Sequence, residues 1–324
     1  MKTKTPDWAL SLSLLNCAAS ILTLVFMWKA AEESFGFRTG LLALLVGSVH
    51  LPWIYLTTYA LPEAIFTCLL AAGAWAAVRI VTSQALPLIP SFVWGILFIW
   101  GFWLKSTHAI LGPLFVLALV SLRREQAHLL IMALVTPVAA GLALHGALTY
   151  DKIGKVRLAA SSSGLNFVEG KCPDKHNLDN FGASWMSPLY HQLDLHKQKQ
   201  LGRPFTESGY YWRQGFRCIK EDPFTLVQSL ESIPYLFFWN TTWPLHQRSD
   251  AARIRLYELF FAVFLTCGLV VYVRDSLWAF DRETFVVWSL PVLALFLCAY
   301  IFKSKMRYRL PFEFAHLIWP TLIV

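Results

Sequence analysis

The stretch ALPEAIFTCLLAAGAWAAVRIVT, residues 60–82, decides the fold class of the chain. Its only charged residues are Glu63 near the start and Arg79 near the end. A helix of about 20 apolar residues is long enough to cross the hydrocarbon core of a bilayer. Similar apolar runs occupy residues 9–30, 127–148, 255–275 and 284–303. Because an apolar chain in lipid must satisfy its backbone hydrogen bonds internally, these runs predict α-helices.

Three other apolar segments are less regular. Residues 40–58 are a slightly short candidate for a span, and residues 89–121 predict two short helices that break near Lys105. Residues 310–324 form another apolar run, in which the sequence ends. With 56% hydrophobic and 15% charged residues, the composition is far more apolar than that of most soluble chains. The sequence therefore predicts an all-α polytopic membrane protein with about eight to nine transmembrane helices and one large external loop domain.

Residues 150–254 are the one long segment with the composition of a soluble domain, since they are rich in Gly, Asn, Asp, Lys and Pro. This segment divides the chain into three predicted parts. Residues 1–149 are expected to form an N-terminal transmembrane helix bundle, and residues 150–254 a soluble loop domain in the periplasm. Residues 255–324 are expected to form C-terminal transmembrane helices, the last of them incomplete.

Helices that alternate across the bilayer place several polar features on one face. These are Glu63, the turn at residues 105–108, the 150–254 loop and the cations at residues 303–309. Lys and Arg residues near the spans are balanced between the two sides, so the positive-inside rule does not orient the chain. If residues 121–126 (SLRREQ) are cytoplasmic, the shared face is the outer one.

The net charge of +8 does not indicate nucleic-acid binding. The cations lie in short loops and in the soluble segment, without a basic stripe or stacking aromatic residues. Membrane lipids are therefore the expected partners, and nucleic acid is not. No spacing of Cys, His, Asp or Glu predicts a metal site. The cysteines outside the soluble segment are interpreted as small hydrophobic residues: Cys17, Cys68, Cys267 and Cys298.

Three ionisable residues are candidates for a polar site. Glu63 follows Pro62 at a helix end, so it either serves a function or caps the helix that Pro62 begins. Lys105 interrupts an apolar run with no acid nearby, so its charge must meet water, a distant carboxylate or a ligand. Snorkelling to the interface is the alternative for Lys105. His108 is either a substrate contact or an interfacial histidine with satisfied hydrogen bonds.

The segment KSKMRYRLPFEF, residues 303–314, gathers four cations between two apolar stretches. Arg307 and Arg309 suit phosphate binding, because the planar guanidinium can grip two phosphate oxygens at once. Lys303 and Lys305 are interpreted as contacts to solvated lipid headgroups. The alternative is that all four cations only anchor the helix.

Cys172 and Cys218 are the only cysteines of the 150–254 segment. If this segment lies in an oxidising compartment, the two are expected to form a disulfide. Two free thiols are the alternative, and would favour a cytoplasmic loop.

Three stretches resemble the GT-C glycosyltransferases, in particular their bacterial protein-mannosyltransferase-like and aminoarabinose-transferase-like branch. They are FGFRTGLLALLVGSVHLPWIYLTTYALPEAIF (35–66), GILFIWGFWLKSTHAILGPLFVLAL (95–119) and KMRYRLPFEFAHLIWP (305–320). The order and spacing of the stretches carry the resemblance. The 150–254 segment does not match a pattern of that family.

The resemblance implies an integral-membrane transferase that moves a sugar from a polyprenyl-phosphate donor to an acceptor at the outer face of the bacterial inner membrane. It implies that Lys105, Arg307 and Arg309 hold the donor phosphate. Glu63 would lie at the rim of the cavity, and His108 would also contact substrate. The family's catalytic acid lies in a first external loop that this sequence does not contain. That residue is expected upstream of Met1, in a longer chain. The cofactor stays open, with a divalent cation as one option.

Two other functions are compatible with the same features. A transporter or flippase of a lipid-linked sugar would also need interfacial cations and a polar cavity. Transporters tend to contain repeated halves and helices broken at the midplane, and the sequence shows neither a repeat nor a midplane charge. A non-catalytic relic that keeps the fold is the third possibility.

Overall fold

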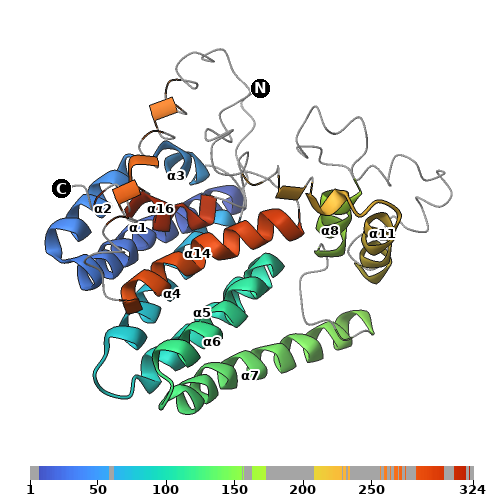
Figure 1. Ribbon diagram of the computed structural model, residues 1–324, viewed down its shortest axis with the longest axis horizontal. Helices are drawn as coiled ribbons and strands as arrows, with labels where there is room; N and C mark the ends of the chain where they lie inside the picture. Colours follow the sequence, from blue (N-terminus) through green and yellow to red (C-terminus); the bar gives the residue numbers. More distant parts are fainter. Residues whose placement is uncertain are drawn as a thin grey trace.

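The computed structural model describes residues 7–57, 62–154, 156, 163–172, 208–227, 229, 230, 233, 282–302, 310–318, 321 and isolated positions between 256 and 274. Every element in this part of the chain is helical (Figure 1). The elements are α1 (Asp7–Phe35), α2 (Phe37–Ser48), α3 (Leu51–Leu56), α4 (Glu63–Thr82), α5 (Leu88–Leu104), η1 (Ser106–Ile110), α6 (Leu111–Leu122), α7 (Ala127–Ile153), α8 (Ser163–Lys171), α11 (Ser208–Glu221), α14 (Arg282–Ile301), η3 (Leu310–Phe312) and α16 (Glu313–Ile318).

Four of the described helices are long and apolar enough to cross a membrane. They cover Leu10–Phe35, Glu63–Thr82, Ala127–Lys152 and Glu283–Ile301, which confirms helices at four of the five long apolar runs. Much of the fifth run, residues 255–275, lies outside the described residues. Shorter apolar helices occupy Phe37–Ser48, Leu88–Leu104 and His108–Leu122. The described part of the chain thus has the architecture of an all-α membrane protein.

The prediction of one helix over residues 40–58 is wrong. This segment divides into α2, which ends at Ser48, and α3, which begins at Leu51. Pro52 explains the division, because it has no backbone N–H and its ring would clash with the carbonyl four residues earlier. The break leaves His50 between two helices, where its backbone N–H bonds to the Gly47 carbonyl.

Helix α4 lies at the centre of the bundle. It packs between α1 on one side and α5 on the other, and it also contacts α14 (Figure 1). Inside the bundle 67% of its span is buried, against 22% for α1 and 28% for α7. The mostly apolar outer surfaces of α1 and α7 therefore remain for lipid, as expected for helices at the edge of a membrane bundle.

The crossing of α5 and α7 depends on Gly95. A Cβ atom at this position would lie 2.3 Å from the Leu134 carbonyl oxygen and 2.7 Å from the Pro137 ring. The absence of a side chain therefore brings the two helix backbones into direct contact. Close approach through small residues is how membrane helices gain packing energy where lipid is as apolar as protein.

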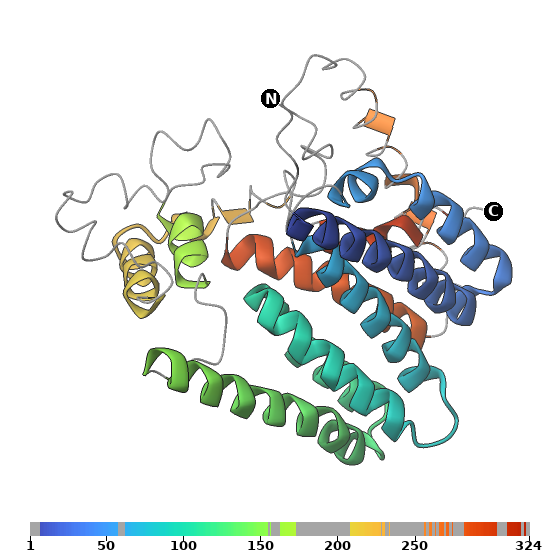
Figure 2. The ribbon, with the colours of Figure 1, turned by 180° about the vertical axis from the view of Figure 1, so that it is seen from behind.

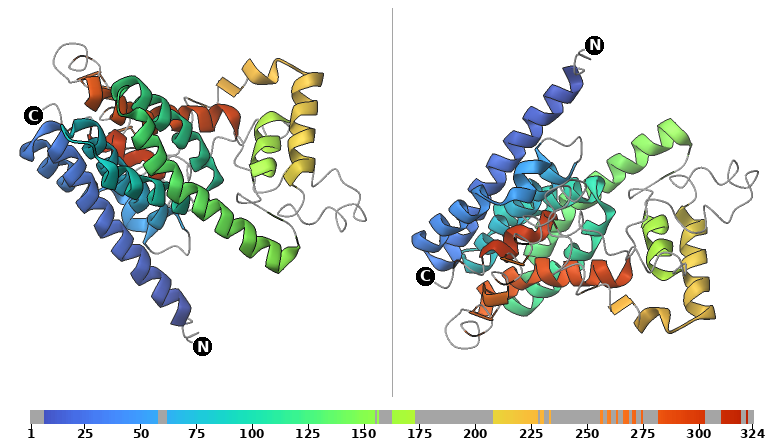
Figure 3. Two further views of the ribbon diagram at one scale, coloured as in Figure 1. Left: turned by 90° about the horizontal axis from the view of Figure 1, so that it is seen from below. Right: turned by 90° about the horizontal axis from the view of Figure 1, so that it is seen from above.

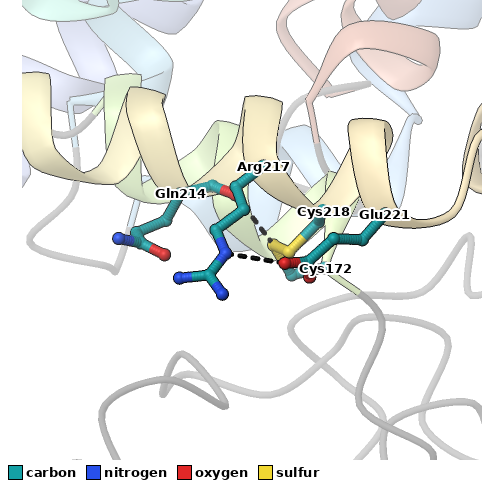
Figure 4. Close-up of a disulfide and its surroundings, with 5 residues drawn as sticks. All are labelled: Cys172, Gln214, Arg217, Cys218 and Glu221. Carbon is teal, nitrogen blue, oxygen red and sulfur yellow. Dashed lines mark hydrogen bonds and ion pairs between the residues drawn. A yellow bond between two sulfur atoms is a disulfide. The ribbon is translucent and has the colours of Figure 1, made fainter.

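Helices α8 and α11 form a small unit beside the end of α14 (Figures 1 and 2). The Phe167 ring of α8 stacks on Trp212 of α11 at 4.2 Å. A disulfide joins Cys172, just after α8, to Cys218 of α11 (Figure 4). Lys171 attaches the unit to the bundle, since its ammonium donates to Ser229 Oγ at 2.7 Å and to the Tyr300 carbonyl of α14. Burial lowers the pKa of Lys171 to about 8, which keeps it largely protonated at neutral pH.

We expect Cys172 and Cys218 to stay unmodified when the protein is denatured in SDS and alkylated without reductant. The two are 46 residues apart, and closing a loop of this size stabilises a folded domain by about 4 kcal/mol in the loop-entropy model. Mass spectrometry of the peptides measures the result. Cys17 and Cys267 are free and serve as internal controls that must be alkylated. Alkylation of both loop cysteines would contradict the bridge.

Candidate functional site

Glu63 and Lys105 form an ion pair inside the helix bundle. The Lys105 ammonium donates to Glu63 Oε1 at 3.0 Å, and the side chains are 10% and 2% exposed. Glu63 is the first residue of α4 and Pro62 its N-cap, so the carboxylate also lies at the positive end of the helix dipole. The sequence left water, a distant carboxylate or a ligand as partners for the Lys105 charge. In the structure, Lys105 pairs with a distant carboxylate, that of Glu63. The structure places this carboxylate in the protein interior.

The chain breaks at Lys105 as the sequence predicts. Lys105 is extended, with φ −143° and ψ 113°, between the end of α5 and the 3-10 turn η1. Its backbone N–H still donates to the Gly101 carbonyl at 2.8 Å, and its carbonyl accepts from the His108 N–H at 3.0 Å. The break turns the side chain toward α4, where the ammonium also lies 5.5 Å from the centre of the Phe66 ring.

His108 belongs to the same cluster. Its side chain is buried, with the ring 5.3 Å from Phe66 and 4.9 Å from Phe98, centre to centre. Gly101 makes this position possible, because a Cβ atom there would lie 2.8 Å from the imidazole. The structure thus brings Glu63, Lys105 and His108 together, as their shared face of the membrane predicts.

Two polar atoms of this cluster have no hydrogen-bond partner among the described residues. They are Glu63 Oε2 and His108 Nδ1, and both are buried. A buried polar atom without a partner costs about 1–3 kcal/mol, so nearly all such atoms in native proteins bind protein groups or water. Both atoms can therefore form a hydrogen bond with a polar ligand without first losing one to a described protein group.

An apolar pocket adjoins the cluster at His108. Its cavity volume is about 30 Å³, so it is narrow, and it is partly open to the outside. The pocket lies between α4, α5, α6 and α14, and its larger side chains include Leu70, Trp94, Phe98, Phe115, Leu290 and Phe314. A ligand with a charged group and an apolar chain could thus contact the polar cluster with the one and the adjoining pocket with the other.

A second buried polar pair connects distant parts of the chain. His50 Nε2 lies 2.6 Å from Glu313 Oε2, and the two side chains are 2% and 0% exposed. His50 also makes an edge contact with Trp53 at 5.3 Å. The pair fixes the junction of α2 and α3 against α16. Sequence reasoning missed Glu313, although it is the one acidic residue of the apolar segment 310–324, which is a signal for a functional or paired carboxylate.

The two polar pairs meet through aromatic side chains. Phe312 precedes Glu313, and its ring lies 6.2 Å from Phe66, which follows Glu63 by three residues. The four cations Lys303, Lys305, Arg307 and Arg309 lie outside the described residues. The segment directly after them, η3 and α16, packs against α4 and α2. Within the described part of the chain, no group of three or more His, Cys, Asp and Glu residues could hold a metal ion.

The pair of His50 and Glu313 should couple strongly in a double-mutant cycle. Removing one partner of a buried pair leaves an unmatched polar group, so Glu313→Leu and His50→Leu should each destabilise the protein by about 3–5 kcal/mol. The double variant should recover about 1–3 kcal/mol of the summed loss. Unfolding in detergent measures all four proteins. Strictly additive losses would contradict a direct interaction.

In the comparison with known proteins, one family model matches part of the chain. Residues 6–144 match the family model described as Dolichyl-phosphate-mannose-protein mannosyltransferase. The matched range contains Glu63, Lys105 and His108 and covers less than half of the chain. Neither the curated proteins nor the solved structures gave a match. The family match supports the GT-C superfamily and, in general terms, a membrane glycosyltransferase that uses a lipid-linked sugar donor.

Proposed function

We infer that this chain transfers a sugar from a polyprenyl-phosphate donor to an acceptor at the outer face of the bacterial inner membrane. The observation that carries the proposal is the buried cluster of Glu63, Lys105 and His108 beside an apolar pocket. A donor of this kind has a phosphate at headgroup depth and a long apolar chain in the bilayer. The cluster and the pocket offer complementary surfaces for these two parts.

In the proposed reaction, an acceptor oxygen forms a bond to the anomeric carbon of the sugar. The bond from that carbon to the phosphate oxygen breaks, and the lipid phosphate leaves with the electron pair. Cations that stabilise this leaving group lower the barrier, and a carboxylate near the acceptor can take its proton. We assign the binding of the phosphate to Lys105, with the pair to Glu63 holding the ammonium in place.

Glu63 has a further role in this proposal. While Oε1 holds Lys105, the buried Oε2 remains able to accept a hydrogen bond from a hydroxyl of the sugar or of the acceptor. His108 Nδ1 is the second such atom, and His108 is also a lining residue of the apolar pocket. Both residues are therefore proposed as substrate contacts.

Arg307 and Arg309 complete the proposed phosphate site. Arg309 directly precedes Leu310, where η3 begins, and η3 packs on α4. Both arginines lie outside the described residues, and their part in the phosphate site is proposed from the sequence. Their planar guanidinium groups would bind phosphate oxygens in pairs.

We predict that farnesyl phosphate, a short probe of the donor, raises the unfolding temperature of the protein more than farnesol does. Lys105→Met should abolish this difference and lower sugar transfer at least about 100-fold, since a charge that stabilises the leaving group is lost. Transfer is measured as label moved from a panel of polyprenyl-phosphate sugars to acceptor in membranes.

The controls separate binding from folding. Lys105→Met leaves Glu63 unpaired and destabilises the protein, whereas the double variant Lys105→Met/Glu63→Leu replaces the pair by apolar groups and should stay folded. Lys29→Met removes a lysine from a more exposed pair with Glu32 and should leave transfer unchanged. A folded double variant with wild-type transfer, or equal stabilisation by farnesol and farnesyl phosphate, would refute the site.

A separate prediction concerns the arginines. Arg307→Lys and Arg309→Lys keep the charge and any anchoring role but remove the planar fork. Each should lower transfer at least about tenfold, a barrier increase of about 1.4 kcal/mol, with membrane insertion intact. Lys303→Gln and Lys305→Gln are the matched controls and should have small effects. Unchanged transfer in both arginine variants would leave the cluster as an anchor only.

A further inference from the structure

Helix α11 has an exposed face of unusual composition. Tyr211, Gly215 and Cys218 face the interior of the α8–α11 unit, where Phe167 fills the space beside Gly215. Residues 213, 216, 217 and 220 follow one another at helical spacing of three and four, so they share the opposite face. They are Arg213, Phe216, Arg217 and Lys220, and all are exposed.

The chain directly after the helix also exposes large apolar side chains. Phe216 and Phe224 are each 59% exposed, and Val227 and Leu230 are about half exposed. Large apolar side chains that are exposed together mark an interaction surface rather than the ordinary scatter of single residues. We call residues 213, 216, 217, 220, 224, 227 and 230 the basic–apolar strip.

The contacts of the unit fix where this strip lies. Lys171 donates to the Tyr300 carbonyl in the last turn of α14, and the Trp212 ring lies 6.1 Å from Phe302. Because α14 is one of the four helices able to span a membrane, its end marks the boundary between hydrocarbon and headgroups. Helix α11 runs across the axis of α14 in views at right angles (Figures 1 and 3), as a helix parallel to the membrane surface would.

The positive charge of the strip indicates what it binds. Arg217 is bound to Glu221 at 2.7 Å, whereas Arg213 and Lys220 make no ion pair with the described residues. Two cations on either side of an exposed phenylalanine match a leaflet in which anionic headgroups lie above acyl chains. A soluble partner would need no such combination at the end of a spanning helix.

We propose that the basic–apolar strip lies in the headgroup region of the outer leaflet, with Phe216 and Phe224 inserted toward the acyl chains and Arg213 and Lys220 bound to anionic lipid phosphates. The disulfide from α8 to α11 and the Lys171 contacts to α14 hold the strip at this depth. The loop unit is thereby a membrane-surface domain. This inference is independent of the sugar-transfer proposal.

Photocrosslinking of the full chain in lipid nanodiscs tests the proposal. The photoreactive residue p-benzoylphenylalanine replaces Phe216 in one protein and Phe224 in a second. A third protein carries it in place of Glu221, an exposed residue that pairs with Arg217 at the edge of the strip and lies about 140° around the helix axis from Phe216. Mass spectrometry then measures lipid adducts. We expect at least about fivefold more lipid adduct at 216 and 224 than at 221.

Lipid composition and charge variants test the electrostatic part. Adding phosphatidylglycerol to phosphatidylcholine discs should raise the adduct at 216 about twofold or more, and Arg213→Gln/Lys220→Gln should abolish that increase. An intact Cys172–Cys218 bridge in each protein reports the fold of the unit. Equal lipid adducts at 216 and 221, or adducts mainly to a second copy of the chain, would overturn the proposal.

Discussion

The buried ion pair between Glu63 and Lys105 is the interaction on which the polar end of the bundle depends. Taking two charges out of water costs several kcal/mol for each ion, and only close contact offsets this cost. The 3.0 Å contact therefore requires the start of α4 and the break after α5 to meet. The extended backbone at Lys105, the 3-10 turn after it and the buried place of His108 all follow from that requirement.

Stability alone does not explain why the pair exists. Replacing a buried ion pair by apolar side chains of similar size is often neutral or stabilising. Glu63 Oε2 and His108 Nδ1 add a further cost, because they lack hydrogen-bond partners in the described structure. Buried polar groups that cost folding free energy, gathered beside an apolar pocket, are typical of a site that binds a ligand with a polar and an apolar part. The second pair, His50 with Glu313, holds the neighbouring segment that follows the cations of residues 303–309.

Hydropathy predicted the helices correctly where a long apolar run alone determines that a helix forms. The runs at 60–82, 127–148 and 284–303 form helices because their length and composition leave no other solution in lipid, and the break at Lys105 follows from a charge in an apolar run. The partners of the charges were not predictable in the same way. His50 and Glu313 are 263 residues apart, and only the packing of α16 against the α2–α3 junction brings them together. The break after Ser48 could have been predicted from Pro52, because a proline disrupts a helix locally.

The end of α14 connects the helix bundle to the α8–α11 unit. Its last carbonyl groups have no partner within the helix, and Lys171 supplies a cation and a hydrogen bond to the Tyr300 carbonyl. The same helix contacts α4 and α6, and Leu290 and Pro291 in its middle line the apolar pocket. One element therefore lines the apolar pocket in its middle and carries the α8–α11 unit at its end. The contact of α14 with the 3-10 turn η1, which directly follows Lys105, brings this helix close to the Glu63–Lys105 pair as well.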